Sequence, residues 1–152
     1  MTFAFKAGPP EGHRVASLLP KLPEWSLDSG HAHPDAGSFI IWANGRYLTG
    51  DTGYAGLPTA RNHNTVTFGG VGQGVEGQHD VWRGARYSGF NGIRIRSVTP
   101  KGNAITIEAD LAAAYPKVGS LFSFTRTFSF DGASTFDVSD RFNLKEPTAI
   151  EW

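Results

Sequence analysis

The residues best suited to chemistry lie between positions 31 and 63, which hold three of the five histidines of this 152-residue chain. His31 and His33 are separated by one residue, so on a strand both imidazoles would face the same side. Asp51 and His63 follow in the same stretch. Imidazole nitrogens and carboxylate oxygens bind zinc, and a free imidazole is an acid or base near neutral pH. These residues indicate a metal site, an acid–base centre, or both.

His33, Asp51 and His63 form the candidate ligand set for a zinc ion, with water in the fourth position. Strands predicted over residues 38–43 and 46–50 form a hairpin around Asn44-Gly45, which brings His33 and Asp51 to one end of it. His63 stands just ahead of the next predicted strand and can reach the same end. The alternative is three separate loop residues bonded to backbone, because the chain has neither HExxH nor another short ligand pair.

The other polar residues of this kind have weaker claims to a role. His31, one alternation away from His33, is a candidate acid or base beside the metal, or else an exposed loop histidine. Asp35 follows a proline and precedes a glycine by two positions, which favours a turn. His13 and His79 stand in polar or glycine-rich loops and are expected on the surface.

Length and composition argue against several classes of protein. The length suits a single domain with its own core. Lys plus Arg equals Asp plus Glu at 14 each, so no net field favours nucleic acid or a membrane surface. The chain has no cysteine, which excludes disulfides and thiolate chemistry. No apolar run approaches the roughly 20 residues of a membrane helix, and the first residues do not resemble a signal peptide.

The elements that must position the site are strands. Nineteen glycines and nine prolines interrupt the chain, so no long amphipathic helix is expected, and β-favouring residues gather in short runs. The pattern predicts an all-β, two-layer antiparallel β-sandwich, with residues 1–37 and 69–80 as loops. Its strands are expected over residues 38–43, 46–50, 64–68, 81–88, 93–99, 104–110, 120–130 and 135–143. The last residues, 147–152, look like the start of another strand, so we expect the natural protein to continue.

Two segments need separate interpretation. The glycine patch over residues 69–78 lacks the Lys-Ser/Thr ending of a phosphate loop, so a flexible surface loop is predicted. In the run Phe122 to Phe130, phenylalanines occupy every even position except 126, which is the alternation of a strand with one buried face. Arg126 interrupts that face. It either pairs with a carboxylate such as Asp140, snorkels to the sheet edge, or binds a ligand.

The chain resembles the C-terminal β-sandwich region of heparinase II/III-like polysaccharide lyases, the group that includes oligoalginate lyases. The resemblance rests on motifs spread over nearly the whole chain: residues 5–9, 31–39, 50–54, 61–66, 113–116, 125–128 and 137–140. It implies an enzyme that cleaves uronic-acid-containing glycans, such as glycosaminoglycans or alginate, by β-elimination. It further implies that the cleft lies between this sandwich and an N-terminal α/α toroid, and that the full-length protein is periplasmic or secreted.

The resemblance also assigns roles to residues. It implies that His33, Asp51 and His63 bind a largely structural zinc ion and that His31 is the sandwich's catalytic group. Arg61 and Tyr54 are the expected substrate contacts. The tyrosine acid or base and the group that neutralises the uronate carboxylate belong to the toroid, so this chain alone is expected to be folded and inactive.

Two other functions stay open at this point. A non-catalytic carbohydrate-binding module could hold sugar on aromatic residues such as Trp42, Tyr54, Trp82 and Tyr87. Alternatively, the metal could be no more than a staple for a structural domain. Fold alone does not choose among these functions.

Overall fold

The computed structural model describes residues 1–22, 31–53, 56–75, 81–83 and 87–152. Its strands are β1 (Thr2–Phe5), β2 (Phe39–Ala43), β3 (Arg46–Tyr47), β4 (Thr67–Phe68), β5 (Arg94–Lys101), β6 (Ala104–Asp110), β7 (Leu121–Phe130), β8 (Phe136–Leu144) and β9 (Ile150–Glu151). Its helices are α1 (Gly12–Leu18) and four short 3₁₀ turns, η1 (Leu19–Lys21), η2 (Ala60–Asn62), η3 (Tyr87–Gly92) and η4 (Ala112–Ala114). The fold is therefore mostly β, as predicted.

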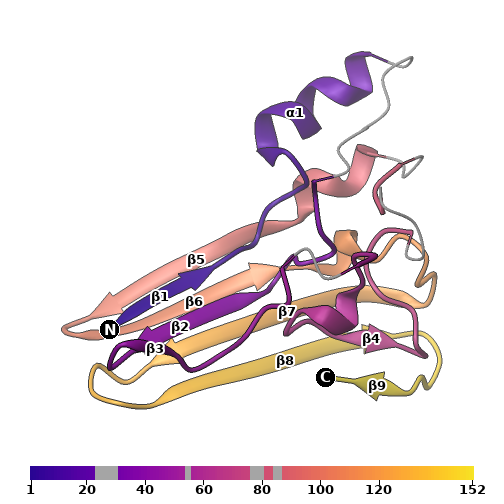
Figure 1. Cartoon of the computed structure of the whole chain (residues 1–152). Helices are drawn as coiled ribbons and strands as arrows, with labels where there is room; N and C mark the ends of the chain where they lie inside the picture. The colour runs from indigo at the N-terminus through magenta and orange to yellow at the C-terminus, as the bar shows by residue number, and fades with distance from the viewer. Residues whose placement is uncertain (23–30, 54–55, 76–80, 84–86) are drawn as a thin grey trace.

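The strands form two packed antiparallel layers. One is a four-stranded sheet in the order β5-β6-β7-β8, and the other is a three-stranded sheet in the order β1-β2-β3. Figure 1 shows β1, β2 and β3 lying over the larger sheet, with α1 beyond one end of it. β4 and β9 pair separately beside η2. This arrangement confirms a sandwich-like domain.

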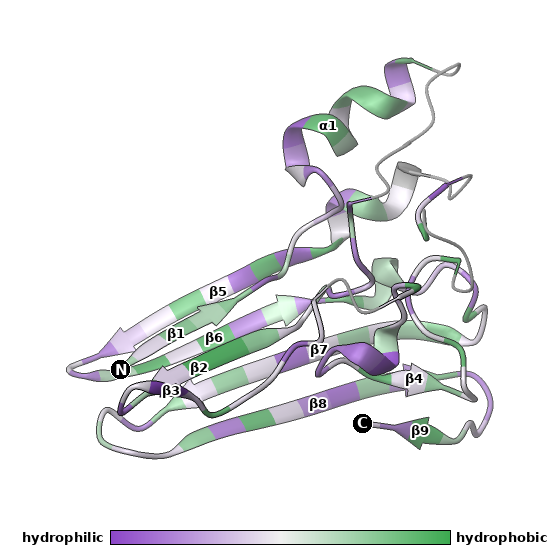
Figure 2. Ribbon diagram, in the orientation of Figure 1, coloured by the Kyte–Doolittle hydropathy of each residue, from purple (hydrophilic) through white to green (hydrophobic). Residues whose placement is uncertain are grey.

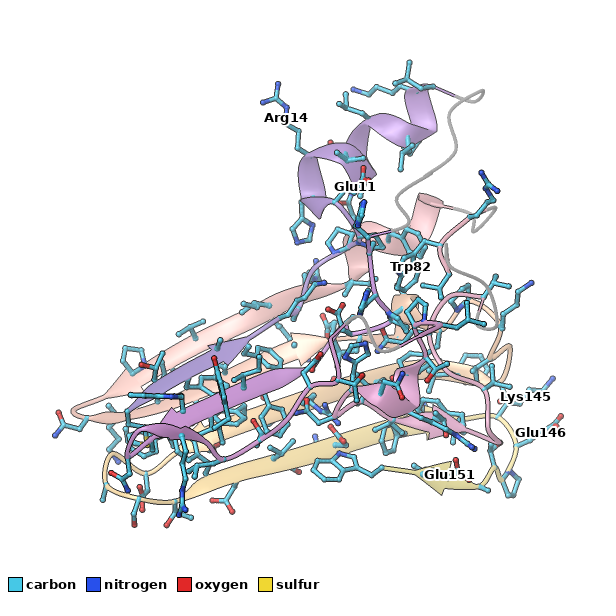
Figure 3. All side chains as sticks on the ribbon, in the orientation of Figure 1. Glu11, Arg14, Trp82, Lys145, Glu146 and Glu151 are labelled. Atoms are coloured by element: carbon cyan, nitrogen blue, oxygen red, sulfur yellow. The ribbon has the colours of Figure 1, made fainter. Side chains whose placement is uncertain are left out.

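Aromatic side chains fill the space between the two layers. Phe39 and Ile41 of β2 pack with Phe128 of β7, and the rings of Phe3 and Phe128 stack with centroids 3.7 Å apart. The inward positions alternate along each strand, and Figure 2 shows the matching bands of hydrophobic and hydrophilic residues along β8. A larger cluster that includes Trp82, labelled in Figure 3, fills the end of the sandwich beneath α1 and η3.

Turns and long strands agree with the sequence analysis. Asn44 and Gly45 both adopt positive φ between β2 and β3, at 52° and 77°. At the β7–β8 turn the Asp131 carboxylate accepts the N–H groups of Ala133, Ser134 and Thr135. These bonds, the Thr135 one foremost, lower the pKa of Asp131 to about 2. Residues within each turn thus stabilise the turn conformations that join β2 to β3 and β7 to β8.

Several predicted boundaries are wrong. The strand expected over residues 81–88 is absent from its described part: residues 81–83 form a turn, and η3 begins at Tyr87. Val81 and Trp82 are apolar because they are buried core residues at 0% and 1% exposure, not because they form a strand. The strands expected over 46–50 and 64–68 shrink to two residues each, β3 and β4.

Two expectations about irregular regions also need correction. Residues 1–37 were expected to be loop, yet they contain β1 and α1. Both elements are too short to show a clear period in the sequence, and β1 forms because β2 supplies its ladder of hydrogen bonds. Phe122, expected to face inward, is 64% exposed because the register shifts between Leu121 and Ser123. Such a bulge turns the residue to the other face.

Candidate functional site

The centre of the candidate site is a buried imidazole held by a carboxylate. η2 ends immediately before His63, whose backbone N–H closes that turn on the Ala60 carbonyl at 3.1 Å. The His63 side chain is 1% exposed, and its Nδ1 lies 2.6 Å from Oδ2 of Asp51. Asp51 also accepts the Gly53 N–H at 2.7 Å. The turn before β4 and the loop after β3 therefore meet at this pair.

His33 joins the same pair from a third segment. Its ring centroid lies 5.4 Å from that of His63, with the two planes 54° apart. The structure therefore brings His33, Asp51 and His63 together, the same three residues that the sequence analysis grouped. Together with Lys6 and Asp35, Asp51 lines a cavity of about 190 Å³ over the start of β2.

The electrostatics of Asp51 follow from these neighbours. Burial on its own raises the pKa of this carboxyl. The hydrogen bonds from Gly53 and His63 and the charges of His63 and His33 act in the opposite direction. Their sum holds the pKa of Asp51 below its usual value, so the carboxylate is ionised at neutral pH.

The residues present fit a metal by chemistry, although their donor atoms do not form a coordination shell. His63 Nε2 is buried and has no hydrogen-bond partner among the described residues, which is costly for a ring nitrogen. Two ligands of one tetrahedral zinc ion lie roughly 3.3 Å apart. Nδ1 of His63 and Oδ2 of Asp51 are closer than that, at hydrogen-bond distance. Accordingly, no group of three or more potential ligands within the described ranges is arranged to hold a metal.

Comparison with known proteins bears on the whole chain. The family model for the heparinase II/III-like C-terminal domain matches residues 1–152. This chain belongs to that family. No curated protein matches it significantly. Membership makes the heparinase II/III-like domain part of a polysaccharide lyase and makes polysaccharides the substrate class, in keeping with the resemblance stated above.

The family also bears on the predicted periplasmic or secreted location. Heparinase-like enzymes generally act in the periplasm or outside the cell. Within the described residues of this heparinase II/III-like domain, no helix is long and apolar enough to cross a membrane.

The segment from His33 to Ser38, which leads into β2, is held by several hydrogen bonds. Gln73, fully buried, donates to the Ala36 carbonyl at 2.7 Å and accepts the Ala36 N–H at 2.9 Å. Trp82 Nε1 donates to the His33 carbonyl at 3.2 Å. Lys6 bonds both oxygens of Asp35, at 2.6 and 2.8 Å, and the Asp35 carbonyl accepts the Ser38 N–H in the predicted turn. The heparinase II/III-like domain therefore ties the backbone at and after His33 to its core.

Gln73 corrects the prediction of a flexible surface loop over residues 69–78. The described part of that segment has no helix and only a single bridge, as expected, but Gln73 is 0% exposed. The glycines allow positive φ at Gly69, Gly70 and Gly74 and let the backbone pass close to the core. A polar side chain between glycines was the available signal for a buried contact.

The other predicted site residues do not join this group of three. His31 is exposed, two positions before His33, at the start of the described range 31–53. Arg61 lies on η2 with its side chain 62% exposed and pairs with Glu151 of β9 at 2.7 Å. Figure 3 labels Glu151 on that strand. Tyr54 lies outside the described residues, and so does His79.

Proposed function

We propose that this domain is the β-sandwich half of the active site of a lyase that cleaves uronic-acid-containing polysaccharides by β-elimination. The observation that carries the proposal is the meeting of His33, Asp51 and His63, with His31 two positions before His33, in a chain of the heparinase II/III-like family. The remaining catalytic groups come from an N-terminal helical domain, with which the sandwich forms the cleft.

The first part of the proposal is a structural zinc ion held by His33, Asp51 and His63. The ion would cross-link three segments that are separate in sequence and so fix the loop that carries His31. Support comes from the residue types, their proximity and the unpartnered buried nitrogen of His63 within the described structure. The nitrogen without a described partner is Nε2, whereas Asp51 bonds Nδ1 on the other side of the ring, so joint coordination requires the Asp51 carboxylate to leave Nδ1 or the ring to turn over.

The second part is the role of His31. β-Elimination needs a base that removes the proton at C5 of the uronate, a group that neutralises the carboxylate, and an acid that protonates the leaving oxygen. His31 is exposed, as a residue facing substrate must be, and an imidazole can both donate and accept a proton. We assign it one of the two proton transfers. Arg61 and Tyr54 remain the proposed substrate contacts.

Metal analysis of the purified chain tests the ligand set. We expect one bound zinc ion per chain in the wild type and little in His33→Ala, Asp51→Ala or His63→Ala. His13→Ala is the matched control, because His13 lies on α1, bonds Asn91 of η3 and should leave zinc content unchanged. Equal zinc content in all the variants would rule out this ligand set.

Activity measurements test the assignment of His31. In the complete lyase, His31→Ala should abolish formation of unsaturated uronate product while zinc content stays normal. The isolated chain should form no such product, because the partner groups are elsewhere. Turnover by the isolated chain, or an active His31→Ala enzyme, contradicts the assignment.

A carbohydrate-binding module without catalysis is the second candidate function. Trp82 is 1% exposed and cannot stack on a sugar, but Trp42 and Tyr47 are cross-strand neighbours on the outer face, 40% and 70% exposed. With Thr2, Ala4 and Ile40 they line a cavity of about 390 Å³. Under this function Trp42→Ala lowers affinity for acidic oligosaccharides, and His31→Ala in the complete protein weakens binding without removing any turnover.

A further inference from the structure

Arg126 is a buried cation whose contacts reach the candidate site. It lies on β7 directly opposite Asp140 of β8, and its side chain is 0% exposed. Nε and one terminal nitrogen donate to the two oxygens of Asp140, at 2.8 and 2.7 Å. The guanidinium therefore sits in a fixed plane with its charge compensated.

The other terminal nitrogen of Arg126 bridges two distant segments. This NH1 group donates to the Gly37 carbonyl at 2.8 Å and to the Asn64 carbonyl at 2.7 Å. Gly37 lies four residues after His33 in the loop that leads into β2, and Asn64 is the residue after His63. One nitrogen thus spans the backbones that carry the two histidines of the site.

A second contact joins the same two segments and shows what Arg126 adds. The Asn64 side chain accepts the Phe39 N–H and donates to the Phe39 carbonyl, both at 2.8 Å. This tie fixes Asn64 against the start of β2, whereas the Arg126 tie anchors both backbones to the larger sheet. Lysine cannot replace it, because an ammonium on a flexible stem has no planar fork to hold a carboxylate and two carbonyls at once.

We propose that Arg126, oriented by Asp140, is a positioning residue that sets the separation of His33 and His63. For its use in metal binding this inference rests on the proposed function. Ligand orientation by such outer contacts is worth about 10- to 100-fold in metal affinity. Arg126 acts through the backbone and touches neither substrate nor metal.

The test compares Arg126→Lys with Phe136→Leu in the same chain. Phe136 packs on Phe3 and Phe128 in the core between the layers, so its variant loses stability without touching either histidine segment. We expect Arg126→Lys to raise the zinc dissociation constant about tenfold or more. In metal-free protein it should also abolish the nuclear Overhauser contact between the His33 and His63 rings. Phe136→Leu should leave both readouts as in the wild type.

A second variant covers the case in which Arg126→Lys does not fold. Replacing a buried ion pair by apolar residues of similar size is often neutral for stability. The double variant Arg126→Met with Asp140→Leu should therefore fold yet show the same loss of ring contact. If a folded variant keeps the wild-type ring contact and zinc affinity, the inference is wrong. Failure of the wild type to bind zinc counts against the proposed function alone, because the ring contact still decides the role of Arg126.

Discussion

At the scale of single residues, the chemistry of the site depends on what surrounds one imidazole. His63 is 1% exposed, bonded to Asp51 on one ring nitrogen and without a described partner on the other. A buried ring nitrogen with no partner loses its hydration without compensation. The folded state therefore needs other interactions to compensate for this lost hydration energy. The nitrogen without a described partner, Nε2, is also available to bind a ligand.

Asp51→Asn tests the charge at this pair. The variant removes a charged hydrogen bond and should destabilise the metal-free domain by about 1–2 kcal/mol near neutral pH. The pKa of Asp51 is lowered in the folded state, so its contribution is present above the unfolded pKa of about 4. It is lost as the pH falls through the folded pKa.

Urea unfolding of the metal-free protein at several pH values between neutral and acid provides the measurement. The difference between wild type and Asp51→Asn should shrink as the pH falls below 4, as an approximate midpoint. Asp137→Asn, at an exposed position of β8, serves as the control for loss of a surface carboxylate. A difference that is constant with pH would show that the Asp51 charge does not act through His63.

At the scale of elements, the histidine loop depends on a close approach at Gly37. This residue has φ of 87°, and a Cβ placed there would lie 2.5 Å from Cδ1 of Leu111. The chain therefore enters β2 in a conformation that other residues adopt only with strain, and it does so against the core. The same residue offers its carbonyl to Arg126.

Gly37→Ala should lower the free energy of unfolding by about 2 kcal/mol or more, since left-handed strain adds to a steric conflict. Gly45→Ala is the matched control: its φ is 77°, but nothing lies within 4 Å of the added Cβ. That variant should lose only about 1 kcal/mol, the cost of the strain alone. Equal losses in urea unfolding would show that Leu111 moves away freely.

The elements also show what the sequence predicts and what it does not. β5 to β8 were predicted to within about two residues because long alternating runs and Asx-Gly turns are local signals. The grouping of His33, Asp51 and His63 followed from one hairpin and its turn. Gln73 and the bridging bonds of Arg126 were not predicted, because each joins segments more than thirty residues apart through buried backbone carbonyls. Local sequence patterns do not predict contacts of this kind.

At the scale of the whole molecule, the candidate site lies where three irregular segments converge at the edge of the sandwich. Two of them flank β2 and β3 of the smaller sheet and the third follows η2, and the cluster of Phe39, Ile41 and Phe128 between the layers contains no residue of these segments. Cohesion there depends on polar contacts such as Lys6–Asp35 and Arg126–Asp140. A bound metal would add a cross-link between these segments.

Removal of zinc should therefore destabilise the domain as a whole. A ligand that binds only the folded state stabilises it by about 4 kcal/mol when present at roughly a thousand times its dissociation constant. Urea unfolding of the wild type with excess zinc, compared with unfolding in a chelator, should show a shift of this order. His63→Ala should unfold identically in both conditions, because it lacks a ligand, whereas His13→Ala should behave as the wild type does. Superimposable wild-type curves would mean that zinc does not bind the native state, and the cohesion of this corner would then rest on its hydrogen bonds and ion pairs, among them those of Arg126 with Asp140, Gly37 and Asn64.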